Sequence, residues 1–230
     1  MTGFLPLVLA LAAFVAVHAV MSRKWLRDPL AARLGRAGYG AANGTVSLLL
    51  MILVFWALRE APYVELWPPL AALRGAPFVA MPLAGILLVA AIGTPGAGLS
   101  GDRLPTAGAV APGILSITRH PLPWALVLWA GSHMAANGDL AAFLVFGAFL
   151  AFAAAGPALI DRRRRRLCGE AAWTSFAAIT STLPFAAALA GRTAIDWRGI
   201  GWIRPAIAVL AWLALMFAHP WIAGVPIVDF

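Results

Sequence analysis

Charged residues are scarce in this chain. They make up 11% of its 230 residues, whereas hydrophobic residues make up 62%. A soluble domain has about a quarter of its residues charged, so this chain has too little polar surface to cover a globule that faces water. The mean hydropathy of +0.88 predicts a membrane protein with several spans. Disordered chains, coiled coils and ordinary cytosolic enzymes are excluded by the same composition.

Cysteine and acidic residues are also rare. The one cysteine, Cys168, cannot form an internal disulfide, and no spacing of cysteine and histidine is typical of a zinc site. With 9 acidic residues in all, the predicted membrane segments lack the paired carboxylates of acid–base catalysis. The serine nucleophile motif G-x-S-x-G is missing as well. These absences exclude disulfide scaffolds, zinc enzymes and serine hydrolases of the common type.

One glycine-rich stretch, residues 96–101 (G-A-G-L-S-G), has the formal spacing of a dinucleotide-binding loop. Such a loop needs a strand before it, a helix after it and an acidic residue about 20 positions further on. Here an apolar helix is predicted before it, Pro105 interrupts the segment after it, and no acidic residue lies between Asp102 and Asp139. We therefore predict a flexible loop and no dinucleotide site.

Six apolar stretches predict transmembrane helices, because each is long enough, or nearly so, to cross a hydrocarbon core of about 30 Å. They are residues 3–22, 41–58, 77–93, 121–136, 140–160 and 205–223. The first stretch is interpreted as a retained helix and not as a signal peptide, since its cations come after the apolar run. The fourth is the shortest of the six.

The connections complete the predicted architecture. Residues 137–139 predict a tight turn in which Asp139 caps the fifth span. Residues 23–40 predict a short basic helix at the membrane interface. In the connection after the fifth span, four residues at helical spacing predict an amphipathic helix that lies on the membrane. These four are Trp173, Phe176, Ala177 and Thr180. The expected fold class is therefore all-α, a polytopic transmembrane bundle of about six spans, with residues 1–230 forming one domain.

Cations are distributed unevenly along the chain, which carries 17 Lys+Arg against 9 Asp+Glu and a net charge of +8. The connections after the first, third and fifth spans hold 15 of the 17 cations. The positive-inside rule therefore predicts that both termini lie outside the cytoplasm. The run Arg162–Arg166 is interpreted as part of this topology signal in preference to a site for lipid headgroups. We expect no nucleic acid partner.

The four histidines, His18, His120, His133 and His219, are the most informative polar residues. His18 and His133 fall inside the first and fourth predicted spans, where an ionisable side chain is costly and suggests function. A hydrogen bond between helices could satisfy each imidazole. Alternatively, two imidazoles in an apolar pocket could hold haem iron. The residues by themselves leave both interpretations open.

A group of short stretches, strongest within residues 116–192, forms a recognisable pattern. It consists of Thr118–Arg119–His120–Pro121, Trp124, Trp129, His133, Asn137–Gly138–Asp139–Leu140, Asp161–Arg162–Arg163, Trp173, Phe176, Thr180–Ser181, Leu183–Pro184–Phe185 and Gly191–Arg192. This pattern resembles the NnrU family of bacterial integral membrane proteins. The resemblance implies a location in the inner membrane and an association with nitrite and nitric oxide reduction.

The NnrU family is in turn similar to plant zeta-carotene isomerase, a membrane enzyme that uses haem b. This resemblance implies haem b as cofactor, with His18 and His133 as the iron ligands. At 1.5 Å per residue His133 lies about 20 Å deeper than His120, whereas His18 lies near the cytoplasmic edge, so His120 is kept as the alternate ligand. Arg119 is expected to anchor the inner surface through a carboxylate or a haem propionate.

The triplet Arg119–His120–Pro121 also has a fainter likeness to the isoprenylcysteine carboxyl methyltransferases, which bind S-adenosylmethionine. Their motif continues with a tyrosine, whereas Pro123 stands here, and Trp173 and Phe176 replace a later tyrosine pair. The likeness implies a shared fold ancestry and gives methyl transfer as an alternative function.

These residues and resemblances support three functional hypotheses. The first is a haem b-dependent isomerase or redox component that acts on a lipophilic substrate entering from membrane lipid. The second is an S-adenosylmethionine-dependent membrane methyltransferase that uses Arg119 and His120. The third is a non-enzymatic assembly factor whose partner is a respiratory reductase.

Overall fold

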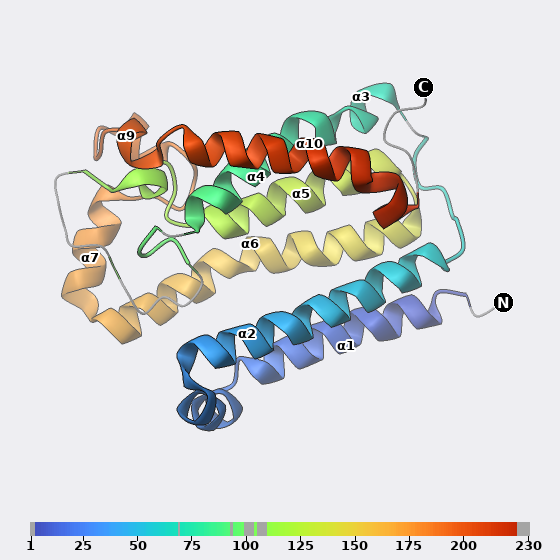
Figure 1. The fold of residues 1–230 in the computed structure, drawn as a ribbon, viewed down its shortest axis with the longest axis horizontal. Helices are drawn as coiled ribbons and strands as arrows, with labels where there is room; N and C mark the ends of the chain where they lie inside the picture. The colour runs from blue at the N-terminus through green and yellow to red at the C-terminus, as the bar shows by residue number, and fades with distance from the viewer. Residues whose placement is uncertain (1–2, 69, 93, 99–103, 105–109, 225–230) are drawn as a thin grey trace. The chain divides into compact units, whose positions relative to one another are not determined.

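The computed structural model of the chain describes residues 3–68, 70–92, 94–98, 104 and 110–224. Throughout these residues the regular structure is helical, and the only strand-like pairing there is one isolated bridge between Glu65 and Asp139 (Figure 1). The predicted all-α fold class is confirmed. The glycine-rich stretch at 96–101 extends outside the described residues, so the loop predicted there is described only in part.

All six apolar stretches coincide with helices. These are α1 (Leu5–Met21), α2 (Lys24–Arg59), α4 (Ala76–Ala91), α5 (Pro121–Asn137), α6 (Leu140–Cys168) and α10 (Ile203–Ala223). Four segments are long and apolar enough to cross a membrane, namely Ala37–Arg59, Ala71–Ala91, Leu140–Cys168 and Ile203–Ala223. A fifth is added if α1 and the segment Lys24–Gly35, which are bent by 69°, count as one span. The count of six spans stays a prediction.

The chain divides into two compact units, and the first consists of residues 1–68 and 138–148. In this unit α1 packs against α2, and the Tyr39 hydroxyl donates a hydrogen bond to the Met21 carbonyl. Gly35, with φ of 72° and ψ of 165°, breaks α2, because this left-handed backbone is accessible to glycine at little cost. The part of α2 before the break agrees with the basic helix predicted at 23–40.

The second unit consists of residues 69–137 and 149–230. Its centre is α4, which packs against both α5 and α10. Gly85 on α4 approaches Ala208 so closely that a Cβ at position 85 would lie 3.5 Å from the Ala208 carbonyl oxygen. Small residues at such a crossing let helix backbones come together, which is a common device in membrane bundles.

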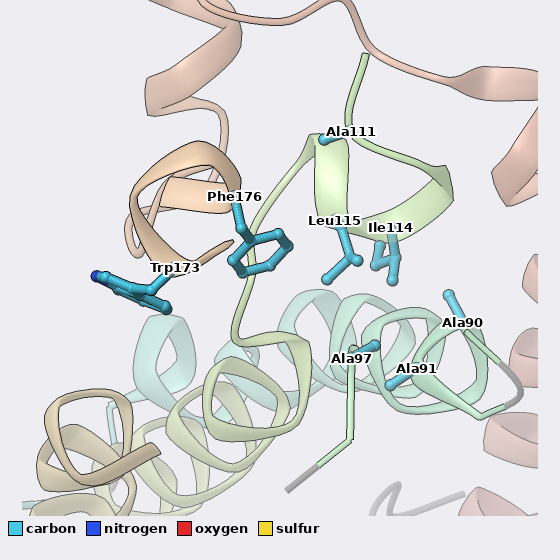
Figure 2. Close-up of a cluster of buried hydrophobic side chains, with 8 residues drawn as sticks. All are labelled: Ala90, Ala91, Ala97, Ala111, Ile114, Leu115, Trp173 and Phe176. Atoms are coloured by element: carbon cyan, nitrogen blue, oxygen red, sulfur yellow. The ribbon is translucent and has the colours of Figure 1, made fainter. Parts of the chain in front are cut away.

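Shorter helices complete this unit. They are α3 (Ala71–Arg74), the 3-10 helix η1 (Gly113–Ser116), α7 (Glu170–Ile179), α8 (Ala186–Leu189) and α9 (Trp197–Ile200). Figure 2 shows a buried hydrophobic cluster where the end of α4, η1 and α7 meet. Its members are Ala90, Ala91, Ala97, Ala111, Ile114, Leu115, Trp173 and Phe176.

The helix predicted around Trp173 exists as α7, but its apolar face does not point to lipid. Trp173 and Phe176 are each only 3% exposed, and Thr180 is fully buried. The apolar stripe packs against protein, because η1 and the end of α4 present small and branched aliphatic side chains to it (Figure 2). The interpretation of this stripe as a membrane-facing surface was wrong.

The predicted turn between α5 and α6 is confirmed. Gly138 has φ of +71° and ends α5, while the Asp139 carboxylate accepts a hydrogen bond of 2.9 Å from the Ala142 N–H and caps α6. The Gly138 carbonyl accepts hydrogen bonds from the N–H groups of Leu66 and Trp67, at 2.8 and 3.1 Å. The segment after α2 is thereby fastened to this turn.

Replacing Gly138 with alanine should destabilise the fold. The new Cβ would lie 2.5 Å from the Trp67 carbonyl oxygen, and the positive φ would strain any side chain. We expect Gly138→Ala to lower the free energy of unfolding by about 1–3 kcal/mol, measured by thermal or denaturant unfolding in detergent. Gly131→Ala is the matched control, since its Cβ meets nothing within 4 Å. Equal stability of the two variants would contradict the role assigned to the turn.

Candidate functional site: a buried charge cluster

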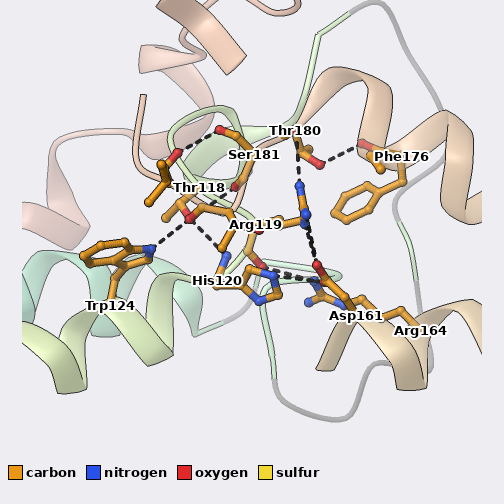
Figure 3. Close-up of polar contacts among 12 residues, drawn as sticks. Thr118, Arg119, His120, Trp124, Asp161, Arg164, Phe176, Thr180 and Ser181 are labelled. Carbon is orange, nitrogen blue, oxygen red and sulfur yellow. Dashed lines mark hydrogen bonds and ion pairs between the residues drawn. The ribbon is translucent and has the colours of Figure 1, made fainter. Parts of the chain in front are cut away.

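The residues before α5 are held by the segment after α7. The Arg119 N–H donates a hydrogen bond of 2.9 Å to the Ser181 carbonyl, and the Thr118 hydroxyl donates one of 2.8 Å to the Thr182 carbonyl. Trp124, on the first turn of α5, donates its indole N–H to the same Thr182 carbonyl at 2.8 Å. Pro121 disfavours helical backbone at His120, so α5 starts abruptly and the side chains before it turn toward α6 (Figure 3).

Asp161 on α6 is the centre of the site. Its Oδ2 accepts hydrogen bonds from Nε and Nη2 of Arg119 at 3.1 and 2.9 Å. Its Oδ1 lies 2.9 Å from Nε2 of His120 (Figure 3). The carboxylate that Arg119 contacts is therefore Asp161, a residue of the same chain. A planar guanidinium suits such a double contact in a way that the single ammonium of lysine does not.

Arg164 lies one turn after Asp161 and is 1% exposed. Its Nη1 donates a hydrogen bond of 3.1 Å to the Arg119 carbonyl and lies 3.8 Å from Asp161 Oδ1. Its Nη2 donates to the carbonyls of Gly96 and Gly98. Arg164 therefore ties α6 to the residues after α4 and to those before α5. Arg164 thus differs from a simple topology signal, because it is buried and bonded to backbone carbonyls.

Aromatic rings from α7 cover the cluster. The Arg119 guanidinium lies 5.3 Å from the ring centroid of Trp173, and Arg165 lies 5.5 Å from the same ring. Arg164 lies 5.6 Å from the ring centroid of Phe176. These distances are within the range of cation–π attraction, which strengthens when the cation is removed from water. The buried face of α7 therefore helps to stabilise the charges as well as the apolar core.

His120 is enclosed by this cluster, with its side chain 0% exposed. Burial lowers the pKa of His120 below its usual value of 6.5, against the opposite effect of the Asp161 carboxylate. The charges of Arg164 and Arg119 lower this pKa further. Within the described part of the chain, Nδ1 of His120 has no hydrogen-bond partner. The imidazole is therefore held neutral near pH 7, and Asp161 and the two arginines contribute a net charge of +1 (two positive, one negative).

The remaining predicted site residues lie elsewhere. His133 is half-buried on α5, and its Nδ1 lies 2.8 Å from the Trp129 carbonyl oxygen, to which it can only donate. His18 is half-buried on α1 and stacks on Phe14, with ring centroids 6.1 Å apart. His18 belongs to the first unit and His133 to the second. The structure thus brings Arg119 and His120 together, whereas the pairing of His18 with His133 stays a prediction.

Two residues of the cluster had no role predicted from the sequence, namely Asp161 and Arg164. Asp161 belonged to the family pattern, and Arg164 was one member of the arginine run. Their spacing of i and i+3 places them on one face of α6, and this was the available signal. No group of three or more histidine, cysteine or acidic residues that could hold a metal ion occurs among the residues that the structure describes.

The fold and site define a class: a multi-pass helical membrane protein with a buried arginine–aspartate–histidine cluster at one end of α6. Comparison with protein families then gives the particular family. The family model described as NnrU protein matches residues 6–227, so the chain belongs to the NnrU family. No curated protein and no solved structure matches the chain.

Loss of the buried guanidinium should be costly. Arg164→Gln removes the donors to the Gly96 and Arg119 carbonyls and the buried positive charge beside Asp161, so we expect the free energy of unfolding to fall by about 3 kcal/mol. Arg166→Gln is the matched control, since Arg166 is exposed, and should change stability by no more than about 0.5 kcal/mol. Unfolding in detergent measures both. If the two variants were equally stable, the structural role of Arg164 would be refuted.

His120 should make stability depend on pH. Below its usual pKa of 6.5 the unfolded chain takes up a proton at His120 that the folded chain resists. The free energy of unfolding should therefore fall as the pH is lowered from about 7 through 6.5 and below, until the lowered folded pKa is reached. His120→Gln should show a shallower pH dependence in denaturant unfolding between pH 8 and pH 5. Measurement at pH 8 isolates the purely structural cost of the substitution. Identical slopes for both proteins would count against a neutral, buried His120.

Proposed function

We propose that this protein is an inner-membrane component of nitrite and nitric oxide reduction that binds haem b and acts on a small lipophilic substrate. The observation that carries the proposal is the match of the NnrU family model to residues 6–227. An apolar substrate reaches such a protein through the hydrocarbon, and the exposed faces of the candidate spans are suited to that route, since they carry large apolar side chains such as Leu49, Val79 and Leu210.

The haem component of the proposal depends first on His133. Because Nδ1 donates to the Trp129 carbonyl, the lone pair of the neutral imidazole is on Nε2. Histidines that ligate metals commonly use this arrangement, in which a backbone carbonyl fixes the tautomer and orients the ring. The Trp129 ring lies 5.8 Å from the His133 ring and 5.4 Å from the Phe149 ring, so an aromatic side chain flanks the imidazole. His133 would therefore suit a ligand of the haem iron, and His18 is the proposed second ligand.

His120 fits this role poorly. Its Nε2 is directed at Asp161, and the ring is enclosed by protein (Figure 3). We therefore assign His120 to the charge cluster and no longer retain it as the alternate ligand. When bound, haem b would supply reversible iron redox chemistry. The residues of the chain would hold and orient the ring system and keep water away from it.

The methyltransferase hypothesis is the second candidate, and the geometry gives it no support. It requires Arg119 and His120 to contact S-adenosylmethionine. Both side chains are instead directed at Asp161 and covered from α7. The assembly-factor hypothesis makes no demand on these residues, and it is distinguished by the absence of bound haem.

Absorbance spectroscopy of the purified full chain, oxidised and reduced with dithionite, tests the proposal. We expect the sharpened bands of a reduced b-type haem at about one haem per chain. His133→Ala and His18→Ala should each lose most of the haem, because each removes one of the two proposed iron ligands. His120→Ala is the control, because it removes an imidazole that is enclosed in the charge cluster, and it should retain the haem.

The alternatives give different results in the same experiment. His120→Ala should retain haem, and loss of haem in this variant alone would return His120 to the ligand pair. A wild-type chain that stays colourless after expression with added haem would sink the haem proposal. Co-purification of such a colourless chain with a reductase would then favour the assembly-factor hypothesis.

A further inference from the structure

The connection between α6 and α10 exposes large apolar side chains outside any candidate span. Leu189 is 86% exposed, Trp202 77%, Trp197 66% and Leu183 61%. The helices of this connection, α7, α8 and α9, have 10, 4 and 4 residues, too short to cross a bilayer. Exposed apolar side chains of this size and number are typical of a surface that contacts a partner or a membrane.

The position of the connection places it at the boundary of the bilayer. The candidate span α6 ends at Cys168 and the candidate span α10 begins at Ile203, directly after Trp202. With no span between them, both ends of the connection lie on the same side of the membrane. In Figure 1, α7, α9 and the first turns of α10 gather at the end of the second unit where α6 also ends. Tryptophan is enriched at this depth, where lipid headgroups begin.

Positive charge accompanies these apolar side chains. Residues 169–202 contain two acidic residues, Glu170 and Asp196. Glu170 lies 3.9 Å from Arg165, and Asp196 accepts the backbone N–H groups of Gly113 and Gly199 at 2.8 and 2.9 Å. Residues 183–204, which include these apolar side chains, hold three arginines, Arg192, Arg198 and Arg204, against the one carboxylate of Asp196, a net charge of +2 (three positive, one negative). Arg198 is exposed and directly adjoins Trp197.

We propose that Leu189, Trp197, Arg198 and Trp202 form an interfacial surface that binds the headgroups of anionic phospholipids. The two indoles and the leucine enter the region between headgroups and acyl chains, while the guanidinium of Arg198 contacts a lipid phosphate through two N–H donors. Charge complementarity favours anionic over zwitterionic headgroups. A bilayer is favoured over a protein partner, because the junction with α10 brings this surface to the lipid boundary in any case.

Native mass spectrometry of the purified full chain in detergent tests the surface. Phosphatidylglycerol and phosphatidylcholine are titrated separately, and the affinity for each bound lipid is measured. We expect tighter binding of phosphatidylglycerol, reduced roughly fivefold by Arg198→Gln and further when Trp197→Ala and Trp202→Ala are added. Arg59→Gln is the matched control, an exposed arginine at the end of α2, and should leave the affinity unchanged.

A second measurement uses the wild-type chain, so it holds even if a variant misfolds. Phosphatidylglycerol with a photoreactive headgroup should crosslink to peptides within residues 183–204. Crosslinks confined to other segments would overturn the proposal, and so would equal phosphatidylglycerol affinity in the wild type and the Arg198→Gln variant. If the variants kept their lipid affinity but lost a co-purifying protein, the surface would be a protein interface, and the lipid proposal would be overturned.

Discussion

The contact between Asp161 and Arg119 holds the polar end of the second unit together. Two nitrogens of Arg119 reach one carboxylate oxygen, and the backbone of the same arginine is bonded to Ser181 and to Arg164. One acid therefore connects α6, the start of α5 and the segment after α7. Removing a single partner from a buried charge pair is far more costly than the pair is stabilising, since the remaining charge has lost its solvation. The donors that this one carboxylate does not use are bonded to backbone carbonyls, since Arg119 reaches Thr180 and Arg164 reaches Arg119, Gly96 and Gly98.

His120 and His133 lie in different physical environments. His120 is enclosed with charged neighbours, and burial keeps it neutral. His133 lies on an apolar helix, and its Nδ1 donates a hydrogen bond to the Trp129 carbonyl of the same helix, which orients the ring. The structural imidazole of His120 lies just before α5, and the candidate ligand His133 lies 13 positions further on, within α5. Their surroundings, and not their depth along the helix axis, distinguish them.

Much of the helix layout was predictable from the sequence, and most of the site was not. Apolar runs bounded by proline or glycine set the positions of α1, α4 and α5, because these boundaries are determined by local backbone chemistry. The partner of Arg119 lies 42 positions away on another helix, and no local pattern reports such a contact. Periodicity found the apolar face of α7 but not the residues that cover it. Which residues cover this face depends on the placement of η1, and tertiary packing determines that placement.

The arginine run on α6 contains residues under two different physical constraints. Arg164 has a fixed geometry and several acceptors, whereas Arg162 and Arg166 are exposed and serve as positive charge. For an exposed cation lysine is an adequate substitute, but for a buried fork of donors it is not. As the family diverges, arginine and lysine should exchange freely at the exposed positions of the run, while position 164 stays arginine. The run Arg162–Arg166, which resembles low-complexity sequence, would then contain one invariant arginine beside exposed positions where arginine and lysine exchange.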